Sequence, residues 1–270
     1  MKATKKILKY QKILLFLLSI LIIIVVVFIS NGLIERIFVN KDIKDFINRA
    51  EYVTKIGDTN YYKVKANNNE EATRVFDIND SEQYIGTTGD IILTNRNPLR
   101  YSDLFITKGI VGAFSYLMFL GHASYVTTDD GAVILEITDH INVDGEYFQE
   151  DSGVKYSQNT WISEDDGSPY IIGLRVKGIN GEVKDKLLEF ASDNIGKPYN
   201  YSFIYQKNKF YCTDLVSRAY SASGIRLNYD GFYTTGNDLI VSPNTYIVFI
   251  REKVKEKGET YYNVYYLSEE

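Results

Sequence analysis

The sequence predicts an α+β domain that follows one N-terminal transmembrane helix. Three observations lead to this prediction. An unbroken apolar run from Ile13 to Ser30 follows a basic N-terminus. The stretch 121–137 contains two short apolar runs separated by a polar turn, which is typical of antiparallel strands. Two segments, 181–194 and 213–223, carry apolar residues at helical spacing.

The N-terminal segment has the composition of a membrane anchor. Residues 1–12 contain five lysines and no acidic residue. At about 1.5 Å per residue, a helix over residues 13–34 crosses a hydrocarbon core of about 30 Å. The lysines predict a cytoplasmic N-terminus and an extracytoplasmic domain at the cell membrane. The alternative is a cleaved signal peptide, whose apolar part is shorter, about 7–15 residues, and ends at small residues. The stretch from Phe28 to Gly32 fits that pattern poorly.

Four regions are predicted along the chain. Residues 1–12 form a cytoplasmic tail and residues 13–34 the anchor. Residues 35–83 are predicted as a juxtamembrane helix, over 35–55, and a connector that contains a strand at 61–65. This helix either holds the domain off the bilayer or packs onto it. The catalytic domain is predicted over residues 84–270.

Within residues 84–270, strands and helices are predicted by the spacing of apolar residues. The apolar segment 104–120 is either a core helix or loop, or a flap or surface that dips toward lipid. Residues 142–168 are predicted as a polar loop, whose acidic run at 164–167 lacks the spacing of a calcium loop. The other predicted elements are a strand at 91–94, a buried strand at 170–176, a helix at 181–194 that ends before Gly196, and closing strands at 243–251 and 261–267, the last at the sheet edge.

Cys212 is the single cysteine and a candidate nucleophile. It stands at the first turn of the amphipathic segment 213–223. The unpaired N–H groups and the positive dipole end of a helix start favour the thiolate, which is the reactive form. The alternative is a small buried apolar side chain, which is the usual situation of a free cysteine.

His122 and Glu136 are the candidate partners of this thiol. A three-residue turn that ends at Gly131 pairs Ser124 with Glu136 and places Glu136 on the same face as His122. A change of one residue in the turn would reverse that face. The second histidine, His140, is predicted to be a non-catalytic loop residue. One cysteine and two histidines do not make a zinc pattern, so no metal and no cofactor are predicted.

The order of these motifs resembles a known family, the circularly permuted papain-like cysteine hydrolases of the NlpC superfamily, the YiiX and YaeF type. The resemblance covers residues 84–250. It implies a permuted papain-like fold with a central antiparallel sheet or half-barrel packed against helices. It also implies Cys212, His122 and Glu136 as catalytic residues, with Tyr211, Tyr199 and Asp90 as candidate substrate-binding residues. The motifs that carry it are Gly89–Thr94, Gly121–Val126, Ile134–Glu136, Gly196–Tyr199 and Tyr211–Val216.

Two motifs depart mildly from the family pattern. Thr213-Asp214 stands where Ser-Glu is usual, and Ala123-Ser124 stands where Val-Gly is common after the histidine. Neither change removes a predicted catalytic group. Aromatic residues occupy every second position from Tyr199 to Tyr205, with Phe203 among them, so they either line a substrate groove or cover the core.

The predicted function is a membrane-anchored thiol hydrolase that cleaves amide or peptide bonds. The resemblance implies cell-wall peptides as the substrate. Two alternatives stay open: a lipid acyltransferase or acyl hydrolase that uses the same three residues, and a non-catalytic tethered binding module. The predicted partners are the membrane and one of these substrates. Nucleic acid is excluded, because the net charge is −5 and cationic residues do not cluster outside the N-terminal tail.

Overall fold

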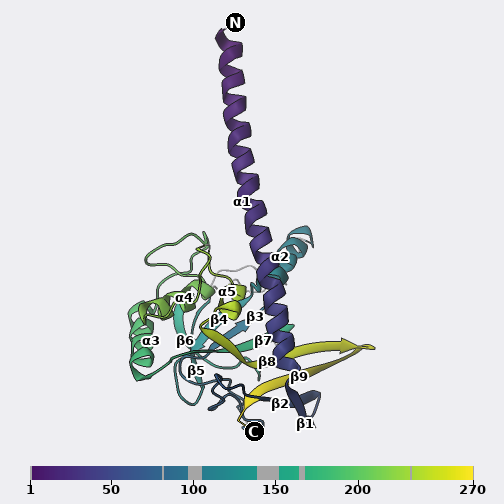
Figure 1. The fold of residues 1–270 in the computed structure, drawn as a ribbon. Helices are drawn as coiled ribbons and strands as arrows, with labels where there is room; N and C mark the ends of the chain where they lie inside the picture. The colour runs from purple at the N-terminus through teal and green to yellow at the C-terminus, as the bar shows by residue number, and fades with distance from the viewer. Residues whose placement is uncertain are drawn as a thin grey trace.

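A long N-terminal helix leads into a domain built on one sheet in the computed structural model (Figure 1). The structure describes residues 2–80, 82–96, 105–138, 152–163, 168–231 and 233–269. Helix α1 spans Lys2–Ile47 without a break. It is long and apolar enough to cross a membrane, with a mean hydropathy of 3.5 over its most apolar 18 residues, and that part is not buried against the rest of the chain. This agrees with the predicted anchor in length and composition.

The C-terminal half of α1 packs against the domain. Val39, Ile43 and Phe46 lie one helical turn apart and are buried in the core. Gly32 lets the backbone approach α2 (Phe105–Met118) closely, because an added Cβ would lie 2.2 Å from the sulfur of Met118. The segment after the predicted anchor therefore packs onto the domain, which is one of the two alternatives that the sequence left open.

The strands form one open sheet within the described part of the chain, in the order β1-β2-β9-β8-β7-β3-β4-β5-β6. Neighbouring strands are antiparallel except for β2 and β9, which pair in parallel. The strands are β1 (Ala50–Ile56), β2 (Thr59–Lys65), β3 (Ile91–Thr94), β4 (His122–Val126), β5 (Val133–Thr138), β6 (Gly153–Gln158), β7 (Tyr170–Val176), β8 (Thr245–Glu256) and β9 (Glu259–Ser268).

The first two strands correct three predictions. The helix predicted over 35–55 ends at Ile47, and β1 follows. The region 35–83, predicted to lie outside the domain of residues 84–270, supplies β1 and β2 to the same sheet as the later strands. Strand β9 was predicted at the sheet edge, but β2 covers its outer side, with Val64 opposite Leu267. Because this pairing joins segments about 200 residues apart, no local pattern in the sequence indicates it.

The helices agree closely with their sequence patterns. Helix α3 (Gly181–Asn194) begins after Asn180, whose side chain accepts the N–H of Val183. It ends before Gly196, which has the positive φ that favours glycine. Helix α4 spans Cys212–Ala222, and the short α5 spans Gly236–Val241 behind a capping box formed by Thr235 and Asp238. The apolar segment before His122 is the helix α2.

One strand was missed in the segment predicted as a loop. Residues 142–168 contain β6, which pairs with β5 at the sheet edge. Its sequence, Gly153–Gln158, has Val154 as its only apolar side chain besides Tyr156, so it lacks a clear strand pattern. His140 and the acidic run 164–167 lie outside the described residues.

Candidate active site

A β-hairpin brings His122 and Glu136 together. Strands β4 and β5 pair with Ser124 opposite Glu136, as the predicted register has it, and Gly131 in the turn has a φ of +76°. The Nε2 atom of His122 lies 2.7 Å from Oε2 of Glu136. Both side chains are mostly buried, with 17% and 13% of their surfaces exposed. Position 121, just before the histidine, requires glycine, because a Cβ on Gly121 would lie 2.1 Å from the carbonyl oxygen of Thr94.

Helix α4 delivers Cys212 to the same histidine. The helix contacts β4 and β5, and Cys212 is its first residue. The N-cap residue Tyr211 forms no side-chain capping bond, so no cap side chain occupies the N–H groups of the first turn. The Cys212 side chain lies within hydrogen-bonding reach of the His122 imidazole. Three residues from two distant parts of the sequence therefore meet in one half-buried cluster.

The cluster holds a proton on the imidazole. Burial alone would lower the pKa of His122, but hydrogen bonds with Cys212 and Glu136 outweigh it and raise the pKa to about 9. Burial would raise the pKa of Glu136, but the hydrogen bond with His122 outweighs it and lowers the pKa to about 2. At neutral pH the pair is therefore an imidazolium beside a carboxylate.

Two further side chains complete the surroundings of this pair, and sequence reasoning missed both. The hydroxyl of Ser157, on β6, donates to Oε1 of Glu136 at 2.6 Å. The ring of Trp161 stacks on the His122 ring at 5.6 Å between centroids, with only 9° between the planes. Both come from the segment predicted as a polar loop. Trp161 is the single tryptophan of the chain, and this rarity is the feature of the sequence that could have marked it as a candidate site residue.

The three predicted substrate-binding residues lie in different surroundings. Tyr211 is buried beside Cys212, and its hydroxyl accepts the backbone N–H of Thr234 at 2.9 Å. Tyr199 is half-buried and packs against the core, next to the ring of Tyr201.

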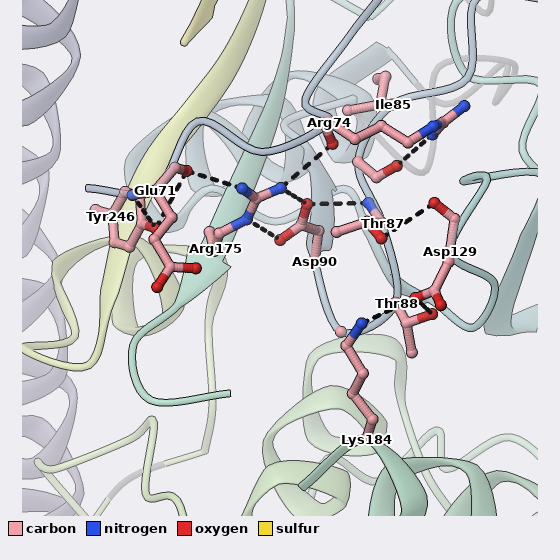
Figure 2. Close-up of polar contacts among 12 residues, drawn as sticks. Glu71, Arg74, Ile85, Thr87, Thr88, Asp90, Asp129, Arg175, Lys184 and Tyr246 are labelled. Atoms are coloured by element: carbon pink, nitrogen blue, oxygen red, sulfur yellow. Dashed lines mark hydrogen bonds and ion pairs between the residues drawn. The ribbon is translucent and has the colours of Figure 1, made fainter. Parts of the chain in front are cut away.

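Asp90 is not brought to the Cys212 cluster. It precedes β3, whose other end, Thr94, is the residue paired with His122. Arg175 on β7 donates to both carboxylate oxygens of Asp90, at 2.8 and 2.6 Å, and Thr87 N–H donates a third bond at 3.0 Å. Figure 2 shows the Arg175 guanidinium between this carboxylate and the carbonyl of Glu71. Asp90 thus joins β3 to β7 by a buried ion pair.

One acidic group has the spacing of metal ligands within the described residues. The carboxylates of Glu35, Asp230 and Asp238 have oxygens within 4.8 Å of one another. The amide of Asn31 donates to Glu35 and to Asp230, and Asp238 accepts from the N–H and hydroxyl of Thr235. These carboxylates therefore have protein partners that join α1 to the start of α5. The group contains none of the predicted catalytic residues.

A match to a family model covers the segment that contains His122, Glu136 and Cys212. Residues 87–237 match the model of a family described as permuted papain-like amidase enzyme, YaeF/YiiX, C92 family. The uncharacterized protein YiiX of Escherichia coli (strain K12) is 32% identical over 76 residues, which are 27% of this chain and 38% of that protein. A crystal structure described as the metalloprotein yiiX from Escherichia coli O157:H7 has a TM-score of 0.42 and 19% identity, over 63% of this chain and 97% of that one.

Proposed function

The chain belongs to the family of permuted papain-like amidases of the YaeF/YiiX type, and from this premise we propose that it is a thiol amidase with Cys212 as nucleophile. His122 is the proposed acid and base, and Glu136 orients it. The observation that carries this proposal is the cluster itself. The imidazole lies 2.7 Å from Glu136 and within hydrogen-bonding reach of the single thiol in the chain. Cell-wall peptides and acyl lipids are the two proposed sources of the amide bond.

The proposed reaction follows from the positions of these groups. The Cys212 thiolate attacks the amide carbonyl carbon, and the oxyanion forms beside the first-turn N–H groups of α4. The His122 imidazolium donates its proton to the departing amine as the C–N bond breaks. Water, deprotonated by the neutral imidazole, then cleaves the thioester and restores the thiol. Glu136 stabilises the imidazolium in both steps, and Ser157 holds the carboxylate in place.

The pH dependence of amide cleavage tests the roles of His122 and Glu136. The imidazolium persists below a pKa of about 9 and is lost as the pH rises through it. Since an amine leaving group needs that proton, kcat/KM for a fluorogenic peptide amide is expected to fall above about pH 9. Glu136→Gln removes the charge that raises the pKa of His122, so this fall is expected at a pH lower by at least about one unit.

Ser157→Ala is the matched control, because it removes a bond to the carboxylate and leaves the carboxylate itself. The fall in kcat/KM is expected to stay within about half a pH unit of the wild-type position. A Glu136→Gln variant whose pH profile coincides with that of the wild type would assign the ionisation to another group and remove Glu136 from the proposed site.

The anchor fixes where the reaction takes place in this proposal. We propose that α1 spans the cell membrane once, with the N-terminal lysines in the cytoplasm and the catalytic domain outside. The packing of Val39, Ile43 and Phe46 in the core supports retention of the helix as part of the mature protein. In intact cells, a membrane-impermeant maleimide is expected to label Cys212, the single thiol. Labelling only after lysis would reverse the orientation.

A further inference from the structure

A buried arginine just beyond the proposed membrane span has no counter-charge. Only 6% of Arg36 is exposed. Within the described residues its guanidinium forms no hydrogen bond or ion pair, and its Nε and Nη1 atoms are buried without a partner. Arg175 is buried to the same degree, but both carboxylate oxygens of Asp90 accept from it. Because an arginine keeps its proton in proteins, Arg36 is a buried cation that lacks an anion.

Two aromatic rings hold this guanidinium in place. The Cζ atom of Arg36 lies 4.4 Å from the centre of the Tyr116 ring and 5.6 Å from that of the Phe119 ring. Tyr116 belongs to α2, which packs against α1 (Figure 1), and Phe119 follows it directly. Ring faces attract a cation but supply no negative charge and no strong acceptor for its N–H groups. Since 58% of Tyr116 is exposed, its side chain can move aside to admit an anion.

The pocket beside Arg36 carries further groups that suit an anion. It has a volume of about 300 Å³. Asn40 and Lys44 also line it, four and eight residues after Arg36 on the same face of α1, and both are exposed. The Tyr170 hydroxyl, at the same pocket, donates to Glu252 at 2.7 Å. In the described part of the chain, that carboxylate forms no ion pair with Arg36, so the charge of the guanidinium stays available to a ligand.

The position of the pocket indicates where its anion comes from. Arg36 stands two residues beyond Ile34, the end of the predicted span, which is about 3 Å along a helix. Lipid phosphates lie at this boundary of the hydrocarbon core, and basic pockets beside membrane helices bind lipid headgroups. An exposed aromatic side chain such as Tyr116 is also typical of this boundary. The planar guanidinium fork matches two phosphate oxygens at once.

We propose that Arg36 and Lys44 bind the phosphate group of a membrane lipid, and that this phosphate completes the packing of α1 against α2. The ligand supplies the missing counter-charge and undergoes no reaction here. The pocket contains none of the proposed catalytic residues. Only the lipid as the source of the phosphate rests on the proposed membrane span. The phosphate site itself rests on the uncompensated charge of Arg36, so a free phosphate ion is the alternative source that the experiment separates.

Binding is measured as the thermal stability of the full chain in a delipidated, uncharged detergent. Three additions are compared: dioleoyl phosphatidylglycerol, dioleoylglycerol, which has the same acyl chains and no phosphate, and inorganic phosphate. Saturating phosphatidylglycerol is expected to raise the melting temperature of the wild type by about 5 °C. Dioleoylglycerol and inorganic phosphate are each expected to raise it by less than about 1 °C.

Arg36→Gln is expected to abolish the rise with phosphatidylglycerol. Without lipid, its melting temperature is expected to equal or exceed that of the wild type, because the variant removes a buried charge that has no partner. A variant that melts below the wild type without lipid and still gains about 5 °C from phosphatidylglycerol would show an arginine with a purely structural role, and would overturn the proposal.

Two exposed lysines of α1 keep the test independent of how well Arg36→Gln folds. Lys44→Gln, in the pocket, is expected to raise the phosphatidylglycerol concentration for half of the shift about fivefold. Lys41→Gln is the matched control, because Lys41 is an exposed cation on the same helix that does not line the pocket. It is expected to leave that concentration within about twofold of the wild-type value.

The three additions separate the sources. A rise with phosphatidylglycerol alone, lost in Arg36→Gln, supports the lipid phosphate. An equal rise with inorganic phosphate, also lost in Arg36→Gln, supports the phosphate site and overturns the lipid as its source. Equal rises with phosphatidylglycerol and dioleoylglycerol, or no rise with any addition, overturn the phosphate site.

Discussion

Replacing Cys212 by alanine is expected to lower the turnover of an amide substrate by about 10⁴- to 10⁶-fold, the range seen when the nucleophile of a catalytic triad is removed. The reason is that no other thiol exists in the chain, so the acyl-enzyme cannot form elsewhere. The residual rate would come from binding and from the helix-start N–H groups alone. The measurement is kcat for a fluorogenic peptide amide with the full chain in detergent or nanodiscs.

The control for this variant is its stability. Cys212 is half-buried at the first position of α4, where alanine is tolerated by the helix. The melting temperature is therefore expected to change by only a few degrees, and Ser217→Ala on the same helix is expected to keep full turnover. If Cys212→Ala retained the wild-type kcat, the thiol would not be the nucleophile, and the proposed mechanism would have to be abandoned.

Replacing Asp90 by asparagine is expected to destabilise the fold by about 3–5 kcal/mol, because it leaves the buried Arg175 guanidinium without its charged partner. Only 2% of the Asp90 side chain and 6% of the Arg175 side chain are exposed. Asparagine keeps the shape but loses the charge and one of the two oxygens that Arg175 contacts. For a domain of this size the melting temperature is expected to fall by about 10 °C.

Asp129→Asn provides the matched control at the same surface pocket (Figure 2). Asp129 pairs with Lys184 at 2.8 Å, but 78% of its side chain is exposed. Since exposed ion pairs contribute little, its loss is expected to lower stability by less than about 1 kcal/mol. Asp90→Asn should keep the wild-type KM at temperatures where it is folded. A raised KM with an unchanged melting temperature would instead restore Asp90 as a substrate-binding residue.

Sequence patterns of short range predicted much of the candidate site. The hairpin register followed from the spacing between Ser124, Gly131 and Glu136, because turn length sets which side chains share a face. The position of Cys212 at a helix start followed from the apolar spacing after it. Helix α3 was predicted over its observed residues for the same reason. These features depend on neighbours within about one hairpin or a few helical turns.

The tertiary structure decided which distant segments meet. Trp161 lies on His122 because β6 pairs with β5, and the sequence of β6 has no clear strand pattern. Asp90 belongs to a motif that resembles the family's, yet the position of β7 makes it the partner of Arg175 rather than of Cys212.

The sequence by itself determined the apolar composition of the N-terminal helix, the hairpin and the start of the cysteine helix, since each is set by backbone and side-chain preferences over a short stretch of chain. Only the folded structure decided that β2 lies against β9 and that Phe28 of α1 reaches Tyr233, whose ring lies near Tyr211 at the start of α4. Contacts of that kind depend on the shape and burial of whole surfaces, which form only when segments distant in the sequence pack together.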